Sequence, residues 1–395
     1  MTTIFPALRP GVSFFKIAGQ NRSDIYVGFN NRGIELKFQI AEQLLRLFDG
    51  RRSLKNITSI IEAEQDQNSN SSDATQSSIA QILHVLSDER LIEFRTSPLP
   101  SQLPKKDLLP VNIINSRNRM RAEENLYSWH PQVDNGLSAE ALIDKRRNFS
   151  IMIYGRNRLA LSLFAVLQAS GFTQIKLTDR TNSASNQSAT QIEPADVCGL
   201  AIRGSDVGLR KALVLADLAR NSQLFPAENL VFPAVPDFII TTETIPQEAM
   251  QIWLSQNIAH MPISNLIENK IIIGPIVIPG KTPCLNCLNL WRADQFPHQN
   301  SFEILAALDS GDGKDLELPS AQVALLTGLI TTQVIQYCSS LDSEGNLVFK
   351  NSIKLAGATL AINLFDPLDS ISSSDETFGY RYWQPHLSCG CQRLI

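Results

Sequence analysis

Four of the six cysteines in this chain stand in two close pairs, and this spacing is the strongest sign of chemistry in the sequence. Cys284 and Cys287 form a C-x2-C pair, and Cys389 and Cys391 form a C-x-C pair. Each pair lies beside a proline or a glycine, which is typical of a turn. Four thiolates from two turns suit the tetrahedral coordination of zinc. The sequence therefore predicts a structural zinc site with no open position for catalysis.

Two other interpretations of these cysteines remain. They could be buried free thiols that fell into pairs by chance. They could also form a redox pair, but a redox C-x-x-C belongs at a helix start in a small thioredoxin-like fold, which the surroundings do not show. His386 precedes the second pair and is predicted to be a neighbour of the metal and not a ligand. Cys198 and Cys338 lie in apolar patterns and are predicted core residues.

A strand, a glycine turn and a helix follow one another at 149–169, and such a unit can bind a nucleotide. A phosphate-binding turn reads G-x-G-x-x-G, because the glycines let backbone approach phosphate and helix pack on strand. Here the turn keeps Gly155 but has Asn157 at the middle position and alanine at the third. Asp179, at the end of the next strand, stands where an acidic residue can meet a ribose. These three residues are predicted to form a degenerate, vestigial cofactor site, and ATP binding by this chain is not expected.

The alternative of a working anion site stays open at this turn. Arg156 and Arg158 flank the middle position and could attract an anion at the N-terminus of the helix.

The elements around these residues indicate a doubly wound α/β domain over 147–395. A strand at 149–154, a helix at about 158–169 and a strand ending at Asp179 make a βαβ unit. Further apolar strand patterns and helical patterns alternate after it, as expected for a sheet with helices on both faces. The strands are predicted at 197–203, 237–243 and 270–278, and the helices at 207–221, 246–258 and 319–338.

The first 96 residues indicate a separate, smaller domain. Short strands at 12–17, 24–29 and 33–39 precede helical patterns at 41–50, 53–63 and 78–89, and a last strand is predicted at 91–95. The polar stretch at 64–78 is predicted to be a loop. Three helices with flanking strands are typical of a winged helix. Residues 97–146 begin with a proline-rich linker and are predicted to connect the two domains with short helices.

Composition excludes several classes of protein. With a net charge of −4, the chain lacks the basic surface of an electrostatic nucleic-acid binder. A DNA-binding winged helix remains an alternative, although its third helix carries one basic and two acidic side chains. No signal peptide and no membrane-spanning stretch is predicted. We therefore expect a cytoplasmic protein, in which close cysteine pairs favour metal binding over disulfides.

The α/β domain resembles the E1-like (ThiF/MoeB) superfamily. The closer resemblance is to its divergent branch, the ThiF-like cyclodehydratase partner proteins of thiazole/oxazole-modified peptide biosynthesis. The stretch 274–292, "GPIVIPGKTPCLNCLNLWR", is similar to that branch's signature, and 385–391, "PHLSCGC", is similar to its H-x-x-C-G-C ending. This chain lacks the acidic residue two positions after Asp179 and the Asn-x-x-Arg-Gln run of catalytic members, and "TTET" stands where an aspartate is expected.

The first domain is similar to the PqqD-like module that recognises leaders of ribosomally made peptides. The resemblance rests on the strand meander, "LLRLFDGRRSLKNITSII" and the closing helix and strand. Such a module binds the leader as an added strand on a sheet edge beside a helix. The resemblance implies contacts with the strand around 34–39 and the helix at 79–89, through Ile34, Leu36, Phe38, Ile82 and Val85.

Together these resemblances imply a non-catalytic or catalytically assisting subunit of an azoline-forming cyclodehydratase. It would bind a precursor leader and present the peptide to a YcaO-family enzyme supplied in trans. A homodimer is expected by analogy, with the apolar helix at 319–338 as one possible interface. The first alternative is an active adenylyltransferase that acts on the C-terminus of a peptide or carrier protein. The second is a zinc-containing winged-helix regulator.

Overall fold

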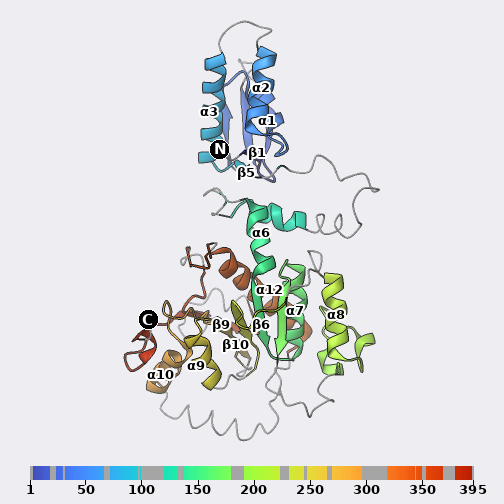
Figure 1. Cartoon of the computed structure of the whole chain (residues 1–395), viewed down its shortest axis with the longest axis vertical. Helices are drawn as coiled ribbons and strands as arrows, with labels where there is room; N and C mark the ends of the chain where they lie inside the picture. Colours follow the sequence, from blue (N-terminus) through green and yellow to red (C-terminus); the bar gives the residue numbers. More distant parts are fainter. Residues whose placement is uncertain are drawn as a thin grey trace. The chain divides into compact units, whose positions relative to one another are not determined.

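The structure is a computed structural model that describes residues 3–17, 24–29, 32–65, 72–96, 98, 120–130, 133, 138–178, 191–222, 231–243, 247–264, 269–295, 318–342, 344–348, 353–367 and 379–393. The chain divides into two compact units, Met1–Asp144 and Lys145–Ile395 (Figure 1). Each unit has its own hydrophobic core.

Unit 1 contains two antiparallel sheets. Strand β1 (Phe5–Leu8) pairs with β5 (Ile92–Arg95), while β2 (Ser13–Lys16), β3 (Ile25–Phe29) and β4 (Arg32–Leu36) form a meander in the order β2-β3-β4. Residues alternate across this meander, so that Ile25, Val27 and Leu36 are buried on one face. Within the described residues β4 pairs only with β3, which leaves its other edge available.

Three helices cover the buried face of the meander in unit 1. They are α1 (Ala41–Leu47), α2 (Leu54–Gln65) and α3 (Ser72–Asp88). Ile57 and Ile61 on α2, and Ile82 and Leu86 on α3, are fully buried at a spacing of four residues. Burying each such side chain contributes about 1.5–3 kcal/mol, so these stripes hold the helices to the sheet. The prediction of a loop as far as residue 78 was wrong, because the first turns of α3 have the polar composition of a loop.

Part of the predicted connection between the domains belongs to unit 1 and packs against its strands. Residues 120–127 are helical, and Trp129 follows them. The Trp129 ring meets Phe29 edge-on at 5.6 Å between centroids, and the Arg9 guanidinium lies 5.2 Å from its centre. Helix α6 (Ala139–Asn148) then crosses the division between the units.

The main sheet of unit 2 is parallel, with the strand order β7-β6-β8-β9. Its strands are β6 (Ser150–Tyr154), β7 (Gln174–Thr178), β8 (Phe238–Thr241) and β9 (Ala259–Pro262). The chain moves outward from β6 in both directions, so β6 and β8 form the switch point of a doubly wound sheet. Strand β8 is buried along its whole length, as expected where helices cover both faces.

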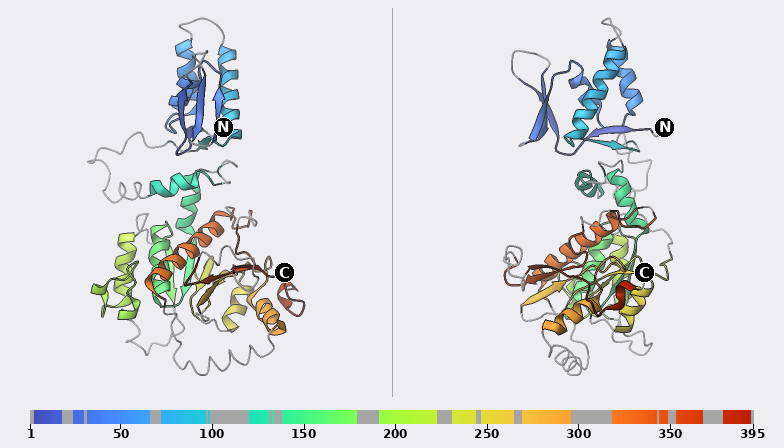
Figure 2. Two further views of the ribbon diagram at one scale, coloured as in Figure 1. Left: turned by 180° about the vertical axis from the view of Figure 1, so that it is seen from behind. Right: turned by 90° about the vertical axis from the view of Figure 1, so that its left-hand side faces the viewer.

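Helices lie on both faces of this sheet (Figures 1 and 2). On one face α7 (Arg158–Ala169) packs against α12 (Ser320–Ser339), and Tyr337 of α12 lies 5.0 Å from Phe238 of β8 between ring centroids. On the other face α9 (Gln247–Ser255) brings Trp253 against Tyr154 and Ile239. Helix α8 (Lys211–Ser222) packs on α7.

A second, antiparallel sheet carries the cysteine-bearing segments of unit 2. It consists of β10 (Lys270–Ile273), β11 (Ala358–Asn363) and β12 (Gly379–Tyr382) in that order. Helix α10 (Leu285–Gln295) follows β10 after residues 274–284. The strands β1, β9, β11 and β12 were not predicted from the sequence.

Three predicted elements differ from the structure. Residues 197–203 are not a strand, because Gly199 turns the chain at a φ of 79° and Ile202 is buried against α7. The apolar pattern there reflects packing and not a sheet. The helix predicted at 246–258 ends at Ser255 and leads into β9, and the strand predicted at 270–278 ends at Ile273. In the described part of the chain, no helix is long and apolar enough to span a membrane.

Candidate functional site

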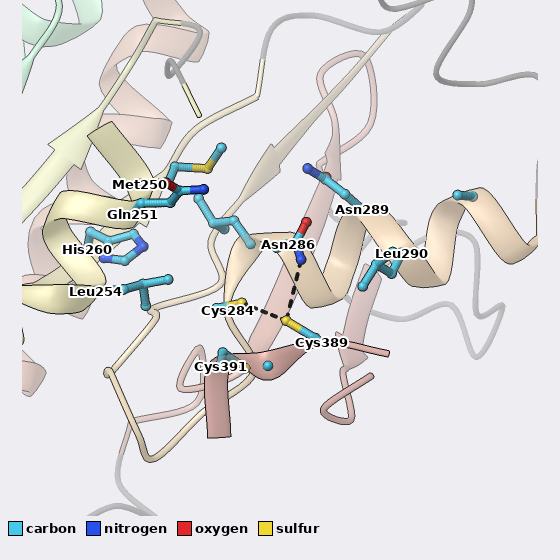
Figure 3. Close-up of a pocket in the computed structure, with 13 residues that line it drawn as sticks. Met250, Gln251, Leu254, His260, Cys284, Asn286, Asn289, Leu290, Cys389 and Cys391 are labelled. Atoms are coloured by element: carbon cyan, nitrogen blue, oxygen red, sulfur yellow. Dashed lines mark hydrogen bonds between the residues drawn. The ribbon is translucent and has the colours of Figure 1, made fainter. Parts of the chain in front are cut away.

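The four paired cysteines meet at one end of α10. Cys284 stands immediately before the helix, and Cys287 lies in its first turn. Cys389 and Cys391 come from the short helical turn η6 (Gly390–Arg393) and the residue before it. The sulfur atoms all lie within 4.8 Å of one another, with 3.5 Å between Cys287 and Cys391 and 3.6 Å between Cys284 and Cys389. Figure 3 shows the contact between Cys284 and Cys389.

Backbone amides already face the sulfur atoms in both pairs. The N–H of Cys287 donates to the thiol of Cys284, and the N–H of Cys391 donates to Cys389. Burial raises the pKa of Cys284, and burial together with a hydrogen bond donated to Cys287 raises the pKa of Cys391 to about 11. Burial also acts to raise the pKa of Cys389, but hydrogen bonds from Cys391 and Asn286 outweigh it and lower the pKa to about 7.

This arrangement fits a metal ion. Cys284 and Cys287 are buried, Cys389 and Cys391 are half-buried, and no disulfide joins them. Metal coordination removes the thiol protons, and N–H donors directed at sulfur stabilise the resulting thiolates. The cluster can therefore hold a metal ion with four sulfur ligands, which leaves no ligand position for a substrate.

A cavity of about 660 Å³ opens beside the cluster, between α9 and α10 (Figure 3). Met250 and Leu254 line it from α9, and Asn289 and Leu290 line it from α10. His260 also lines it, is 1% exposed, and has its Nδ1 3.0 Å from the carbonyl oxygen of Ile258. Burial lowers the pKa of His260 to about 4, so the imidazole is neutral at pH 7.

The predicted cofactor turn lies at the switch point between β6 and β8. Gly155 has a φ of 145°, and a Cβ atom there would collide with Oγ1 of Thr242. Asn157 is the N-cap of α7, since its Oδ1 accepts from Ala160 N at 3.0 Å, and its Nδ2 donates to Thr242 O at 3.1 Å. Asn157 is 3% exposed. The turn keeps the strand-to-helix geometry, but this side chain fills the space in front of the helix.

A carboxylate of the chain also accepts a hydrogen bond from the turn before α7. The backbone N–H of Arg156 donates to Oε1 of Glu243 at 3.0 Å. Arg158 donates to the carbonyl oxygens of Ala195 and Leu318, the latter at 2.9 Å. The backbone donor and the arginine that could bind an anion are therefore engaged within the protein, and these residues do not fit a nucleotide phosphate. Asp179 lies outside the described residues.

The predicted peptide-binding residues lie on β4, just beyond it, and on α3. Leu36 is 1% exposed and Ile82 is fully buried, so both belong to the core of unit 1. Ile34 and Phe38 are partly buried against this core. Val85 is 37% exposed on α3. Ile34, Phe38 and Val85 are thus the residues of this set that an added strand could contact.

An ion pair fixes β4 to α3 at one end. Arg32, the first residue of β4, donates to the carbonyl oxygen of Glu89 at 3.2 Å and to its Oε2 at 3.1 Å. Both side chains are half-exposed, so the pair contributes about 1 kcal/mol or less, but it sets the spacing between the strand and the end of the helix.

Sequence reasoning missed several residues of these sites. The stretch "TTET" was noticed only as a departure from an expected aspartate, yet its Thr242 and Glu243 close the turn after β6. Asn286 lies between two predicted ligands without being singled out. Its position one residue before Cys287 was the available signal.

No protein-family model and no curated protein sequence matches the chain. Solved structures match along nearly its whole length. The crystal structure of E. coli MccB with MccA-N7isoASN has a TM-score of 0.54 and 13% identity, and the match covers 98% of this chain and 99% of that chain. The microcin C7 biosynthetic enzyme MccB in complex with N-formylated MccA matches with a TM-score of 0.55, 14% identity and the same coverage. The heterocyclase TruD matches with a TM-score of 0.52 and 11% identity, over 98% of this chain but 42% of that chain.

Proposed function

We propose that this protein, which has the mixed α/β fold seen in MccB and TruD, binds the leader of a ribosomally made precursor peptide and presents the peptide for azoline formation. The supporting observation is that the likeness extends over 98% of the chain, to an enzyme solved with its peptide MccA and to a heterocyclase. A fold used twice for peptide modification favours a peptide ligand here.

Leader capture takes place on unit 1, which we propose to be a PqqD-like, winged-helix module. The leader adds as a strand to the edge of β4, so that backbone hydrogen bonds supply affinity. Alternate side chains of the leader then reach the apolar strip formed by Ile34, Phe38 and Val85. The Arg32–Glu89 pair joins the strand to the end of the helix at one end of that strip.

The chemistry itself belongs to a YcaO-type enzyme supplied in trans. In that reaction the thiol or hydroxyl of a Cys, Ser or Thr side chain attacks the preceding amide carbonyl. ATP phosphorylates the amide oxygen, and phosphate leaves with that oxygen to give the azoline ring and ADP. One observation supports a separate enzyme: Glu243 and Asn157 hydrogen-bond within the turn before α7, where a phosphate would have to bind. Tethering the peptide raises its local concentration at that enzyme.

The metal of the cysteine cluster is proposed to be zinc, in a structural role. Zinc favours tetrahedral sulfur coordination and has no redox chemistry of its own, so it suits a site that ties together distant segments. A homodimer is also proposed, and light scattering on the purified chain tests it. The apolar character of α12 does not require such an interface, because Ile330 and Val334 are fully buried within unit 2.

The test is to measure binding of the full chain to the leader encoded beside its gene. Val85→Arg places a charge in the proposed groove, so we expect affinity to fall at least tenfold. The matched control is Phe15→Arg, an exposed apolar residue (59%) on β2, at the opposite edge of the meander. Equal loss in both variants, or no leader binding by the wild type, would contradict the proposed groove.

An active adenylyltransferase is the competing function. The crystal structure of E. coli MccB with ATP matches this chain with a TM-score of 0.55 and 13% identity. ATP–pyrophosphate exchange by the purified chain, stimulated by the leader peptide, would favour that function over a presenting subunit. We expect no exchange, because backbone N–H groups at the start of α7 that would bind phosphate already donate to Glu243 and Asn157.

A further inference from the structure

The second cysteine pair is held in place by contacts with α10 that lie outside the sulfur cluster itself. Asn286 stands between the cysteines of the first pair and donates from Nδ2 to Sγ of Cys389 at 3.5 Å (Figure 3). The hydrogen bond therefore crosses from one pair to the other. It places a donor on a sulfur atom that becomes negatively charged when a metal binds.

Further along α10, two side chains hold the residues that precede the second pair. Trp291 donates from Nε1 to the carbonyl oxygen of Gln384 at 2.8 Å. Its ring meets the His386 ring edge-on, with 4.9 Å between centroids. The Nε2 atom of His386 lies 2.9 Å from Oδ2 of Asp294.

Both nitrogens of His386 are used, and this assigns its tautomer. The backbone N–H of Ser388 donates to Nδ1 at 3.1 Å, so Nδ1 is an acceptor. Nε2 therefore carries the proton and donates to Asp294. The backbone N–H of Cys389 donates to the carbonyl oxygen of His386 at 3.0 Å, which closes the turn that leads into the C-x-C pair.

We propose that Asn286 and His386 are positioning residues for the metal site. Asn286 acts on the sulfur of Cys389 directly. His386, held by Trp291 and Asp294, acts on the turn that delivers Cys389. Through these contacts α10 fixes the second pair against the first, so less conformational entropy is lost when the ion binds.

The burial of His386 and Asp294 indicates which of them contributes more to holding the turn. The His386 side chain is 9% exposed, whereas the Asp294 side chain is 62% exposed. An exposed carboxylate is screened by water and contributes little. The imidazole, packed on Trp291 and bonded to the backbone, is therefore the effective part, and its charge is not required.

The experiment measures zinc affinity and cobalt spectra of the full chain in matched variants. Asn286→Asp replaces the donor with a carboxylate facing a thiolate, and His386→Ala removes the turn acceptor. Mutation of a residue that hydrogen-bonds to a metal ligand typically lowers metal affinity by about 10–100-fold, and we expect losses in that range for both variants. With Co²⁺, we expect Asn286→Asp to shift the sulfur-to-metal charge-transfer band, since the thiolate loses a hydrogen bond.

Three further variants isolate the contacts. Asn289→Ala removes a carboxamide that lines the same cavity one turn later, and should leave affinity and spectrum unchanged. Asp294→Asn keeps an oxygen acceptor for Nε2 and should also be near wild type. His386→Asn keeps an acceptor for the N–H two residues on, as in an Asx turn, and should restore part of the affinity lost in His386→Ala.

The outcomes separate this inference from the metal site on which it rests. If the wild type binds neither zinc nor cobalt, the proposed site itself fails. If it binds them and both Asn286→Asp and His386→Ala bind as tightly with unchanged spectra, only the positioning role fails. If His386→Ala does not fold, Asn286→Asp alone decides, because it changes one exposed side chain on a helix.

Discussion

Each sulfur atom of the cysteine cluster has three sulfur neighbours within 4.8 Å, so the loss of one leaves an incomplete site. We expect Cys284→Ser to lose the metal and to unfold unit 2, because an oxygen is a poor substitute for a buried thiolate and binding energy is folding energy in such sites. Metal content per chain and circular dichroism measure this. The control is Cys198→Ser, a buried cysteine outside the cluster, which should keep one metal per chain. A stable, metal-loaded Cys284→Ser protein would remove the structural role.

His260 gives unit 2 a predictable sensitivity to acid. Burial lowers its pKa from 6.5 to about 4, so the unfolded chain binds a proton more readily than the folded one between these values. Stability therefore falls as pH decreases from about 6.5 towards 4. Between pH 7 and pH 5 the loss amounts to about 2 kcal/mol.

Denaturant unfolding of metal-saturated protein at pH 7 and pH 5 tests this. His260→Phe removes the titrating group and keeps an aromatic ring beside Trp253, which lies 5.4 Å away between centroids. We expect the difference between the two pH values to shrink by about 2 kcal/mol in this variant. An unchanged difference would show that another group titrates.

At the residue scale, the grouping of the four cysteines could be predicted, whereas the residues that support them could not. Cysteine spacing indicates a metal site because few other roles need four thiols in two turns. By contrast, Asn286 and Glu243 are ordinary residue types whose roles depend on which segments the fold brings beside them. That information lies in contacts between residues far apart in the sequence.

At the scale of elements, the turn from β6 to α7 has one position that tolerates only glycine. Gly155→Ala would place a Cβ atom against Oγ1 of Thr242 and would strain a backbone with a φ of 145°. We expect unit 2 to lose about 2–4 kcal/mol of stability. Thermal or urea unfolding measures the loss.

The double variant Gly155→Ala with Thr242→Ala separates the two causes. Removing the Thr242 side chain relieves the collision but not the backbone strain, so we expect partial recovery relative to Gly155→Ala. Full recovery would assign the whole cost to the collision. No loss in the single variant would contradict the geometry of the turn.

The sequence predicted elements well where one local pattern decides them. The βαβ unit from β6 to β7 and the apolar helix α12 follow from periodicity and a glycine turn. The strands β11 and β12 were missed because short strands depend on the partners they pair with. The wrong strand at 197–203 has the same cause, since Ile202 is apolar for packing on α7 and not for a sheet.

For the whole molecule, the division into two units makes metal binding and leader binding separable. The four cysteines of the proposed metal site all lie in Lys145–Ile395, and the proposed groove lies in Met1–Asp144. We expect a chelator to lower the melting temperature of unit 2, while the affinity for the leader at low temperature changes less than twofold. Calorimetry and leader titration on the same stripped protein measure both. A parallel loss of leader binding would show that the units depend on each other.

The distance along the chain between the cysteine pairs has a mechanical consequence. A metal held by Cys287 and Cys389 closes the intervening segment, including α12 and β11, into a loop. A pulling force applied at the two ends of the chain would bypass that loop while the metal–sulfur bonds last. Roughly 100 residues, or about 350 Å of extended chain, would then stay hidden and appear in one late step when the bonds rupture. In an optical trap, removal of the metal should abolish this step and release the same length at low force.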